Sequence, residues 1–122
     1  MSTRCQIGFY DSMEKDLEKY EALIYRHSDG YPEGVLPDIV PFLKEFSSDR
    51  GMTDIEYCSA RLLQHLTNLY DAYAKNFLGY GISNSFHGDI EYFYAICSNG
   101  VINIYTSVVI IMNLMNITCW RQ

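Results

Sequence analysis

A long stripe of apolar residues at helical spacing occupies the middle of the sequence. Its members recur at steps of three and four residues, which places them on one face of a single helix: Ile55, Cys58, Leu62, Leu66, Leu69, Tyr73 and Phe77. Thr53 and Glu56 have the spacing of a capping box, and Gly79 is suited to follow the last turn. We therefore predict a helix from about Asp54 to Phe77, with an apolar face that the rest of the chain must cover.

Two strands and a shorter helix are predicted before this element. Apolar and other residues alternate from Arg4 to Tyr10, the period of a half-buried strand, and the run Glu21 to His27 is typical of a second strand. The turn-forming residues that follow end at Pro32, which favours an extended Tyr31 before it. A helix is predicted to begin near Pro37 and to end at Asp49-Arg50-Gly51, burying Ile39, Val40, Leu43 and Phe46.

The last third of the sequence favours strands. A short strand is expected over Ile82 to Phe86, and a hairpin over Glu91 to Cys97 and Val101 to Ser107, joined at Asn99-Gly100. The tail from Val108 to Trp120 is compatible with either a strand or a helix. It carries more apolar surface than a small domain leaves exposed, so we expect a subunit interface there.

These elements predict one α+β domain over residues 1–122, an antiparallel sheet with two main helices packed on it. The chain has 122 residues, 48% of them hydrophobic, which is enough for one packed core. Its formal net charge of −6 opposes binding to duplex nucleic acid. No charged residue occurs between Glu91 and Arg121, but the turn-forming residues and asparagines within that stretch argue against a membrane span.

The four cysteines are widely spaced and are expected to be reduced, as in a cytoplasm: Cys5, Cys58, Cys97 and Cys119. The triplets His27-Ser28-Asp29 and His87-Gly88-Asp89 invite a metal-centre interpretation. We disfavour it because two tripeptides do not supply the hydrogen-bonding partners that orient metal ligands. Acid–base chemistry at the first triplet, or a Cys58–His65 nucleophile pair, has no recognisable third group. We expect no metal, no cofactor and no catalytic residue.

The turn after the second predicted strand gathers groups that suit a nucleotide. Arg26 can pair with phosphate oxygens, Ser28 can donate to them, Asp29 can accept from ribose hydroxyls and Tyr31 can stack on a base. A tight turn in which the Asp29 carboxylate bonds its own backbone is an equally good interpretation of the same residues.

Several segments together resemble one family of proteins. They are Ser2-Thr3-Arg4-Cys5-Gln6-Ile7, Tyr25-Arg26-His27-Ser28-Asp29-Gly30-Tyr31-Pro32, Tyr80-Gly81-Ile82 and Asp89-Ile90-Glu91-Tyr92-Phe93-Tyr94. In order and spacing they look like the first family of phage Thoeris anti-defence proteins, over nearly the whole chain. The resemblance implies a sponge that sequesters, without degrading it, the cyclic ADP-ribose isomer made by a bacterial TIR-domain protein. It also implies action in the cytoplasm of the infected bacterium, as a homodimer that can associate into a hexamer.

The ligand implied by this resemblance carries one adenine, two riboses and a pyrophosphate. Such a ligand calls for cations beside aromatic rings and polar acceptors. We therefore expect Arg4 and Arg26 at the pyrophosphate and an aromatic ring at the adenine, within a site made of Arg4, Arg26, His27, Ser28, Asp29, Tyr31, Tyr80 and Tyr92. The resemblance further implies that some members bind cyclic di- or trinucleotides at separate sites. Arg61 is a candidate for the same pocket or, with His65, for such a second site.

Two other classes of function are compatible with the sequence. A phosphodiesterase or another hydrolase would degrade a cyclic nucleotide signal, with His27, Asp29, His87 and Asp89 as the available acid–base groups. A protein-interaction inhibitor would instead block a defence effector by contact through the apolar tail. The sponge is the preferred hypothesis because no residue pattern of a common hydrolase is present.

Overall fold

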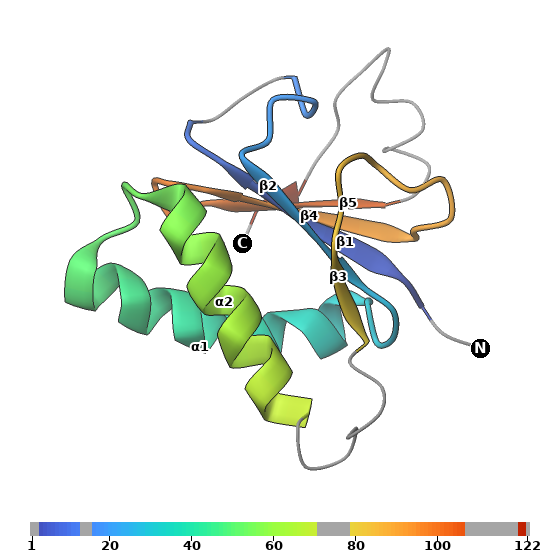
Figure 1. The fold of residues 1–122 in the computed structure, drawn as a ribbon, viewed down its shortest axis with the longest axis horizontal. Helices are drawn as coiled ribbons and strands as arrows, with labels where there is room; N and C mark the ends of the chain where they lie inside the picture. Colours follow the sequence, from blue (N-terminus) through green and yellow to red (C-terminus); the bar gives the residue numbers. More distant parts are fainter. Residues whose placement is uncertain (1–2, 13–15, 71–78, 107–119, 122) are drawn as a thin grey trace.

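The computed structural model describes residues 3–12, 16–70, 79–106 and 120–121. Within these residues, two helices and six strands follow one another (Figure 1): β1 (Cys5–Tyr10), β2 (Ala22–Arg26), α1 (Pro32–Arg50), α2 (Ile55–Tyr70), β3 (Tyr80–Ile82), β4 (Tyr92–Cys97), β5 (Ile102–Thr106) and β6 (Trp120–Arg121). They form a single small α+β domain, as predicted.

The six strands make one sheet in the order β3-β2-β1-β4-β5-β6. Neighbouring strands are antiparallel except for the central pair, β1 and β4, which run parallel with Cys5 opposite Tyr92 and Tyr10 opposite Cys97. The sheet is thus mostly antiparallel but mixed. Strands β1 and β4 can be parallel because both helices and β3 separate them in sequence, a connection long enough to return the chain to the same end of the sheet.

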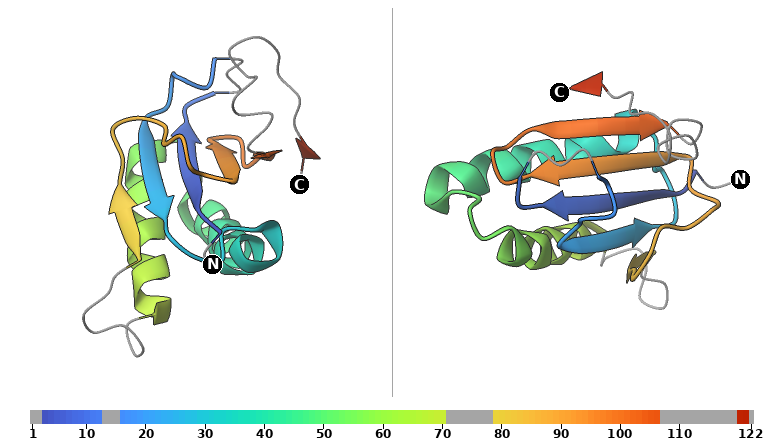
Figure 2. Two further views of the ribbon diagram at one scale, coloured as in Figure 1. Left: turned by 90° about the vertical axis from the view of Figure 1, so that its right-hand side faces the viewer. Right: turned by 90° about the horizontal axis from the view of Figure 1, so that it is seen from above.

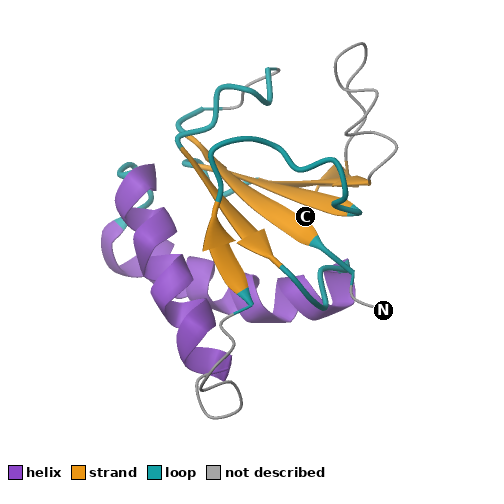
Figure 3. Cartoon of the chain, turned by 45° about the vertical axis from the view of Figure 1, so that its right-hand side comes forward, coloured by secondary structure: helices purple, strands orange, loops and turns teal. Residues whose placement is uncertain are grey.

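Both helices lie on one face of the sheet, and the other face is approached by loops (Figures 2 and 3). The helix-side core unites Ile7 and Phe9 of β1 and Tyr94 of β4 with the buried stripes of α1 and α2. A second apolar cluster on the loop side contains Tyr10, Leu23 and Phe93, among others. Because successive side chains of a strand point to opposite faces, the central strands are buried on both sides.

Helix α1 begins at Pro32, five residues before the predicted start at Pro37, so that prediction is wrong. Pro32 occupies the first turn and Tyr31 is extended, with φ −73° and ψ 158°. Pro37 and Pro41 then lie inside the helix, where the burial of Val35, Ile39, Leu43 and Phe46 compensates for their missing donors. Gly34 is needed in the first turns, because a Cβ there would lie 2.6 Å from the Asp29 carbonyl oxygen.

Helix α2 is confirmed from Ile55 to Tyr70, and the predicted extension to Phe77 falls outside the described residues. Its cap differs from the prediction, because the Asp54 carboxylate, rather than Thr53, accepts the Tyr57 amide at 3.1 Å. Cys58, Leu62 and Leu66 are buried as expected. Leu69, near the end of the helix, is 43% exposed.

The C-terminal hairpin is confirmed as β4 and β5, and Gly100 adopts the positive φ that its turn requires. The short strand is displaced, however. It spans Tyr80–Ile82 rather than Ile82 to Phe86, because these residues pair with the outer side of β2. Phe93 and Tyr94 are both buried, so rings on both faces of this strand belong to the core. The predicted tail, Val108 to Trp120, lies almost wholly outside the described residues.

Candidate functional site

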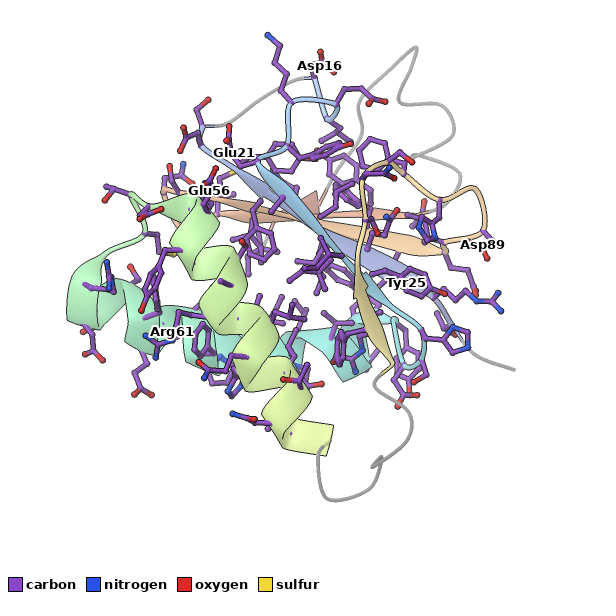
Figure 4. All side chains as sticks on the ribbon, viewed as in Figure 1. Asp16, Glu21, Tyr25, Glu56, Arg61 and Asp89 are labelled. Carbon is purple, nitrogen blue, oxygen red and sulfur yellow. The ribbon has the colours of Figure 1, made fainter. Side chains whose placement is uncertain are left out.

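A cluster of polar and aromatic side chains gathers where β1 begins and β2 ends. We call it the Tyr25 cluster, and it consists of Arg4, Tyr25, His27, His87 and Asp89. The Arg4 carbonyl accepts the Glu91 amide at 2.9 Å, and the His27 amide donates to the Gly79 carbonyl at 2.9 Å. These backbone bonds bring the loop before β4 and the segment before β3 to the same end of the sheet. Figure 4 shows Tyr25 and Asp89 on this side of the molecule.

Tyr25 is the residue that the other members share. Its hydroxyl lies 3.0 Å from Nδ1 of His27, and its ring stacks on the His87 ring with centroids 4.8 Å apart and planes inclined by 25°. Asp89 joins the cluster through Arg4, whose Nη1 lies 3.6 Å from its carboxylate, and through His87 at 4.0 Å. The cluster therefore places a guanidinium, two imidazoles, a phenol and a carboxylate within contact of one another.

The pKa of the Tyr25 hydroxyl is raised above its ordinary value, because the effect of burial exceeds that of the neighbouring Arg4. Partial burial raises the pKa of its hydroxyl, and the nearby Asp89 charge acts in the same direction. The Arg4 guanidinium lowers that pKa by its charge and by a hydrogen bond. Tyr25 is thus protonated at neutral pH and serves as a neutral stacking and hydrogen-bonding group, not as a base.

A buried glutamine fixes the loop that carries His87. Gln6 is fully buried on β1, where its Nε2 donates to the Ser85 carbonyl at 3.1 Å and its Oε1 accepts the His87 amide at 2.9 Å. Both ends of the side-chain amide therefore hold the backbone of the same loop. This arrangement keeps the His87 ring against Tyr25 without any contribution from a ligand.

The chemistry of the Tyr25 cluster suits a small anionic ligand with an aromatic base. Arg4 is partly exposed, so its guanidinium can turn from Asp89 to phosphate oxygens. The exposed His87 ring offers a face for stacking, and the exposed Asp89 carboxylate can accept from hydroxyls.

Arg26 was predicted beside Arg4, but it points to the opposite, helix-facing side of the sheet. It is 3% exposed and pairs with Asp38 of α1 at 2.9 Å, while its Nε donates to the Ser28 carbonyl at 2.8 Å. Its guanidinium lies 5.9 Å from the Tyr80 ring centroid. These contacts join the end of β2 to α1, and they favour a structural role for Arg26.

The remaining predicted residues are divided between two places. Asp29 and Tyr31 form an exposed pair in the turn before α1, with 3.4 Å between the hydroxyl and the carboxylate, and Asp29 has a positive φ of 54°. Tyr92 is half-buried on the helix side and stacks on Tyr94, which donates to the Gly30 carbonyl at 2.6 Å. The eight residues predicted as one site therefore do not share one pocket.

Arg61 and His65 do lie together, in a hollow between α1 and α2. The hollow has a volume of about 330 Å³ and is lined also by Phe42, Phe46 and Arg50. Figure 4 places Arg61 on the far side of the molecule from Tyr25 and Asp89. The structure thus separates this pair from the Tyr25 cluster, as a second site would require.

Sequence reasoning did not assign Tyr25, His87 or Asp89 to the ligand site. Tyr25 and Asp89 occur in segments that carry the family resemblance, and His87 and Asp89 are considered there as a metal-type triplet and as acid–base groups of a hydrolase. The signal that could have joined them is the repetition of the His-x-Asp triplet, because His27 and His87 both contact Tyr25. Among the described residues, no group of three His, Cys, Asp or Glu side chains could hold a metal ion.

The cysteines within the described residues are all buried: Cys5, Cys58 and Cys97. Burial raises the pKa of Cys5 to about 12 and that of Cys58 to about 11, which disfavours the thiolate that a nucleophile requires. His65 contacts the Asp38 carbonyl, at 3.2 Å, and no bond to Cys58 joins it within the described part of the chain. The Cys58–His65 hypothesis therefore lacks support.

Comparison with protein-family models, with curated proteins and with solved structures gives no match to this chain. Within the described residues, no helix has the length and apolar character needed to cross a membrane.

Proposed function

We propose that the chain is an anti-defence sponge, which binds the cyclic ADP-ribose isomer of Thoeris immunity and holds it without degrading it. The resemblance of its sequence segments to phage anti-defence proteins supplies the ligand. The observation that carries the proposal is the Tyr25 cluster, where Arg4 lies beside a Tyr25–His87 ring stack. In this proposal Arg4 binds the pyrophosphate, and the adenine stacks on the exposed face of the His87 ring, whose other face lies on Tyr25.

The wider setting belongs to the same proposal. The chain acts in the cytoplasm of an infected bacterium, as a homodimer or a larger homo-oligomer, and needs no cofactor. Tight binding of a small ligand requires most of its surface to be buried, and the Tyr25 cluster is partly exposed in one chain. A second copy that covers the cluster would complete the enclosure.

A hydrolase is the second candidate, because His87 lies 4.0 Å from Asp89 and His27 lies on the other side of Tyr25. Hydrolysis needs a base that activates water and a group that stabilises the developing charge. In the cluster, however, the Nδ1 atom of His27 is engaged by the Tyr25 hydroxyl, and Asp89 is shared with Arg4. These contacts favour binding over turnover.

Replacement of Arg4 tests the proposal. We expect Arg4→Gln to weaken binding of the cyclic ADP-ribose isomer at least tenfold in isothermal titration calorimetry, because it removes the cation at the pyrophosphate. Lys19→Gln is the matched control, since it removes one positive charge from an exposed position on another loop. Arg4 suits this test better than Arg26, whose replacement would also break the ion pair with Asp38.

Equal affinity of the Arg4→Gln variant and the unmodified protein would remove the Tyr25 cluster from the ligand site. No binding by the unmodified protein would reject the sponge function altogether. An equal loss in both variants would indicate a general effect of net charge and not a defined site.

A further inference from the structure

A groove lies between the C-terminal half of α1 and the turn that joins β4 to β5, and we call it the Lys44 groove. Figure 2 shows this turn and the end of α1 on the same side of the molecule. The groove has a volume of about 530 Å³, and three apolar core side chains line it, Leu43, Met52 and Ile102. None of the described residues that line it is aromatic. An aliphatic chain would therefore find apolar contacts there, whereas a planar base would find no ring to stack on.

One face of α1 supplies the polar groups of the Lys44 groove. Its members follow the i, i+3, i+4, i+7, i+8 spacing of a single helix face: Val40, Leu43, Lys44, Ser47 and Ser48. The neighbouring carboxylates, Glu45 and Asp49, lie on another face of the helix and line the hollow that contains Arg61. The described lining of the groove thus has one cation and two hydroxyls but no carboxylate.

The polar groups of the Lys44 groove are not engaged by the rest of the described chain. Lys44 is exposed, and no ion pair joins it to a carboxylate among the described residues. The hydroxyls of Ser47 and Ser48 form no hydrogen bond within the same part of the chain. On α2, by contrast, the hydroxyls of Ser59 and Thr67 each donate to a carbonyl three residues earlier, at 2.6 and 3.0 Å. The groove therefore keeps an ammonium group and two hydroxyls as donors for an anion.

We propose that the Lys44 groove binds an aliphatic carboxylate of medium chain length, such as a fatty acid. Lys44 pairs with the carboxylate, Ser47 and Ser48 donate to its oxygens, and the alkyl chain covers the apolar side chains of the groove. The volume lies within the roughly 300–1,000 Å³ typical of ligand pockets. The proposal is separate from the function proposed for the Tyr25 cluster, since the groove adjoins the end of β4 and that cluster adjoins its beginning.

Calorimetric titration of the full chain with decanoate tests this inference. We expect saturable binding that Lys44→Gln weakens about threefold, the loss typical of a partly exposed ion pair. Ser48→Trp is expected to weaken binding at least tenfold, because the indole would occupy the groove from an exposed position on the helix. Hexanoate has four fewer methylene groups to bury, so we expect it to bind at least tenfold more weakly than decanoate.

Two controls separate a defined site from a general effect of charge. Lys19→Gln removes one positive charge from an exposed position on another loop and should leave decanoate binding unchanged. Decyltrimethylammonium has a chain of similar length and a cationic head, and we expect it to bind more weakly than decanoate although the net charge of the chain is negative.

Absence of saturable binding at millimolar decanoate would overturn the inference. Full binding in both Lys44→Gln and Ser48→Trp would also overturn it, as would an equal loss in Lys19→Gln or equal binding of the cationic compound. Circular dichroism of each variant verifies that the fold is retained, and the exposure of Lys44 and Ser48 makes unfolding unexpected.

Discussion

At the scale of single residues, Arg26 illustrates how burial changes what a side chain can do. In the sequence it stands among the turn residues that suit a phosphate. In the fold it is 3% exposed, and its charge is balanced by Asp38. Because a buried charge without a partner is costly, the pair is expected to resist separation more strongly than an exposed pair such as Arg4–Asp89.

The first prediction follows from this pair. Asp38→Asn should lower the free energy of unfolding by about 3 kcal/mol, because it leaves the Arg26 charge buried without its carboxylate. Urea unfolding followed by circular dichroism measures this difference. Glu45→Gln is the control, since Glu45 is exposed on the same helix. An equal and small effect of both substitutions would mean that the Arg26–Asp38 pair contributes little to stability.

The buried thiols predict a loss of stability at alkaline pH. The pKa is raised to about 12 for Cys5 and about 11 for Cys58, so the native chain binds these protons more tightly than the unfolded chain. The unfolded thiols ionise above pH about 8.5, and the free energy of unfolding should therefore fall as pH rises beyond that value. Between about pH 7.5 and pH 9.5 we expect a loss of about 1 kcal/mol for each thiol.

Urea unfolding at the two pH values measures this loss, and Cys58→Ala supplies the comparison. The variant is expected to lose less stability over the interval, because one of the two thiols is absent. If the variant and the unmodified protein showed the same pH dependence, the buried Cys58 thiol could not be its source.

At the scale of elements, α1 shows two prolines in a helix interior. The local sequence alone is compatible with two first residues for this helix, since both Pro32 and Pro37 suit the first turn. The choice of Pro32 depends on contacts that are distant in sequence. Gly30 packs against the start of β1, where a Cβ would lie 2.8 Å from the Thr3 carbonyl oxygen, and the Tyr94 hydroxyl donates to the Gly30 carbonyl. These contacts fix the turn and thereby the first residue of the helix.

Replacement of an interior proline tests how much that proline lowers the free energy of unfolding. Pro37→Ala is expected to stabilise the protein by about 1–2 kcal/mol, because alanine restores an amide donor and relieves the ring clash in an exposed part of α1. Pro32→Ala should bring no such gain, since the first turn has no intrahelical partner for that amide. Thermal unfolding of both variants makes the comparison. A destabilised Pro37→Ala would show that the helix accommodates this proline without cost.

Helices and strands whose own apolar residues repeat at a regular spacing were predicted correctly. Features that depend on pairing with a distant strand were not. β1, β2, α2 and the β4–β5 hairpin follow the alternation or the helical spacing of their own residues. β3 has only three residues and exists because it pairs with β2. The parallel pairing of β1 with β4 joins residues more than 80 positions apart, which no local pattern reports.

At the scale of the whole molecule, contacts between residues far apart in sequence also limit how much of the candidate site the sequence predicts. Arg4 and His27 could be proposed from the sequence because their residue types suit the ligand. Tyr25, His87 and Asp89 could not be assigned with them, because their convergence depends on the sheet order and on the loop that Gln6 holds. A predicted set that is contiguous in sequence, such as residues 26–31, is instead divided between the two faces of the sheet.

The net charge of −6 constrains how the chain can bind an anionic ligand. Most of the surface repels anions, so binding must depend on a few arginines that are placed by the fold. Arg4, beside Asp89 at one end of the sheet, is the arginine that the Tyr25 cluster offers to an anion.

The central claim is that the chain holds its ligand and leaves it unchanged. The most direct measurement is to incubate the protein with the TIR-derived cyclic ADP-ribose isomer, remove the free ligand, heat-denature the protein and chromatograph what is released. We predict intact ligand in a stoichiometric amount, which remains unchanged after prolonged incubation. Recovery of a new product would contradict the sponge and identify a hydrolase. Recovery of no ligand would contradict both, and would favour a protein partner.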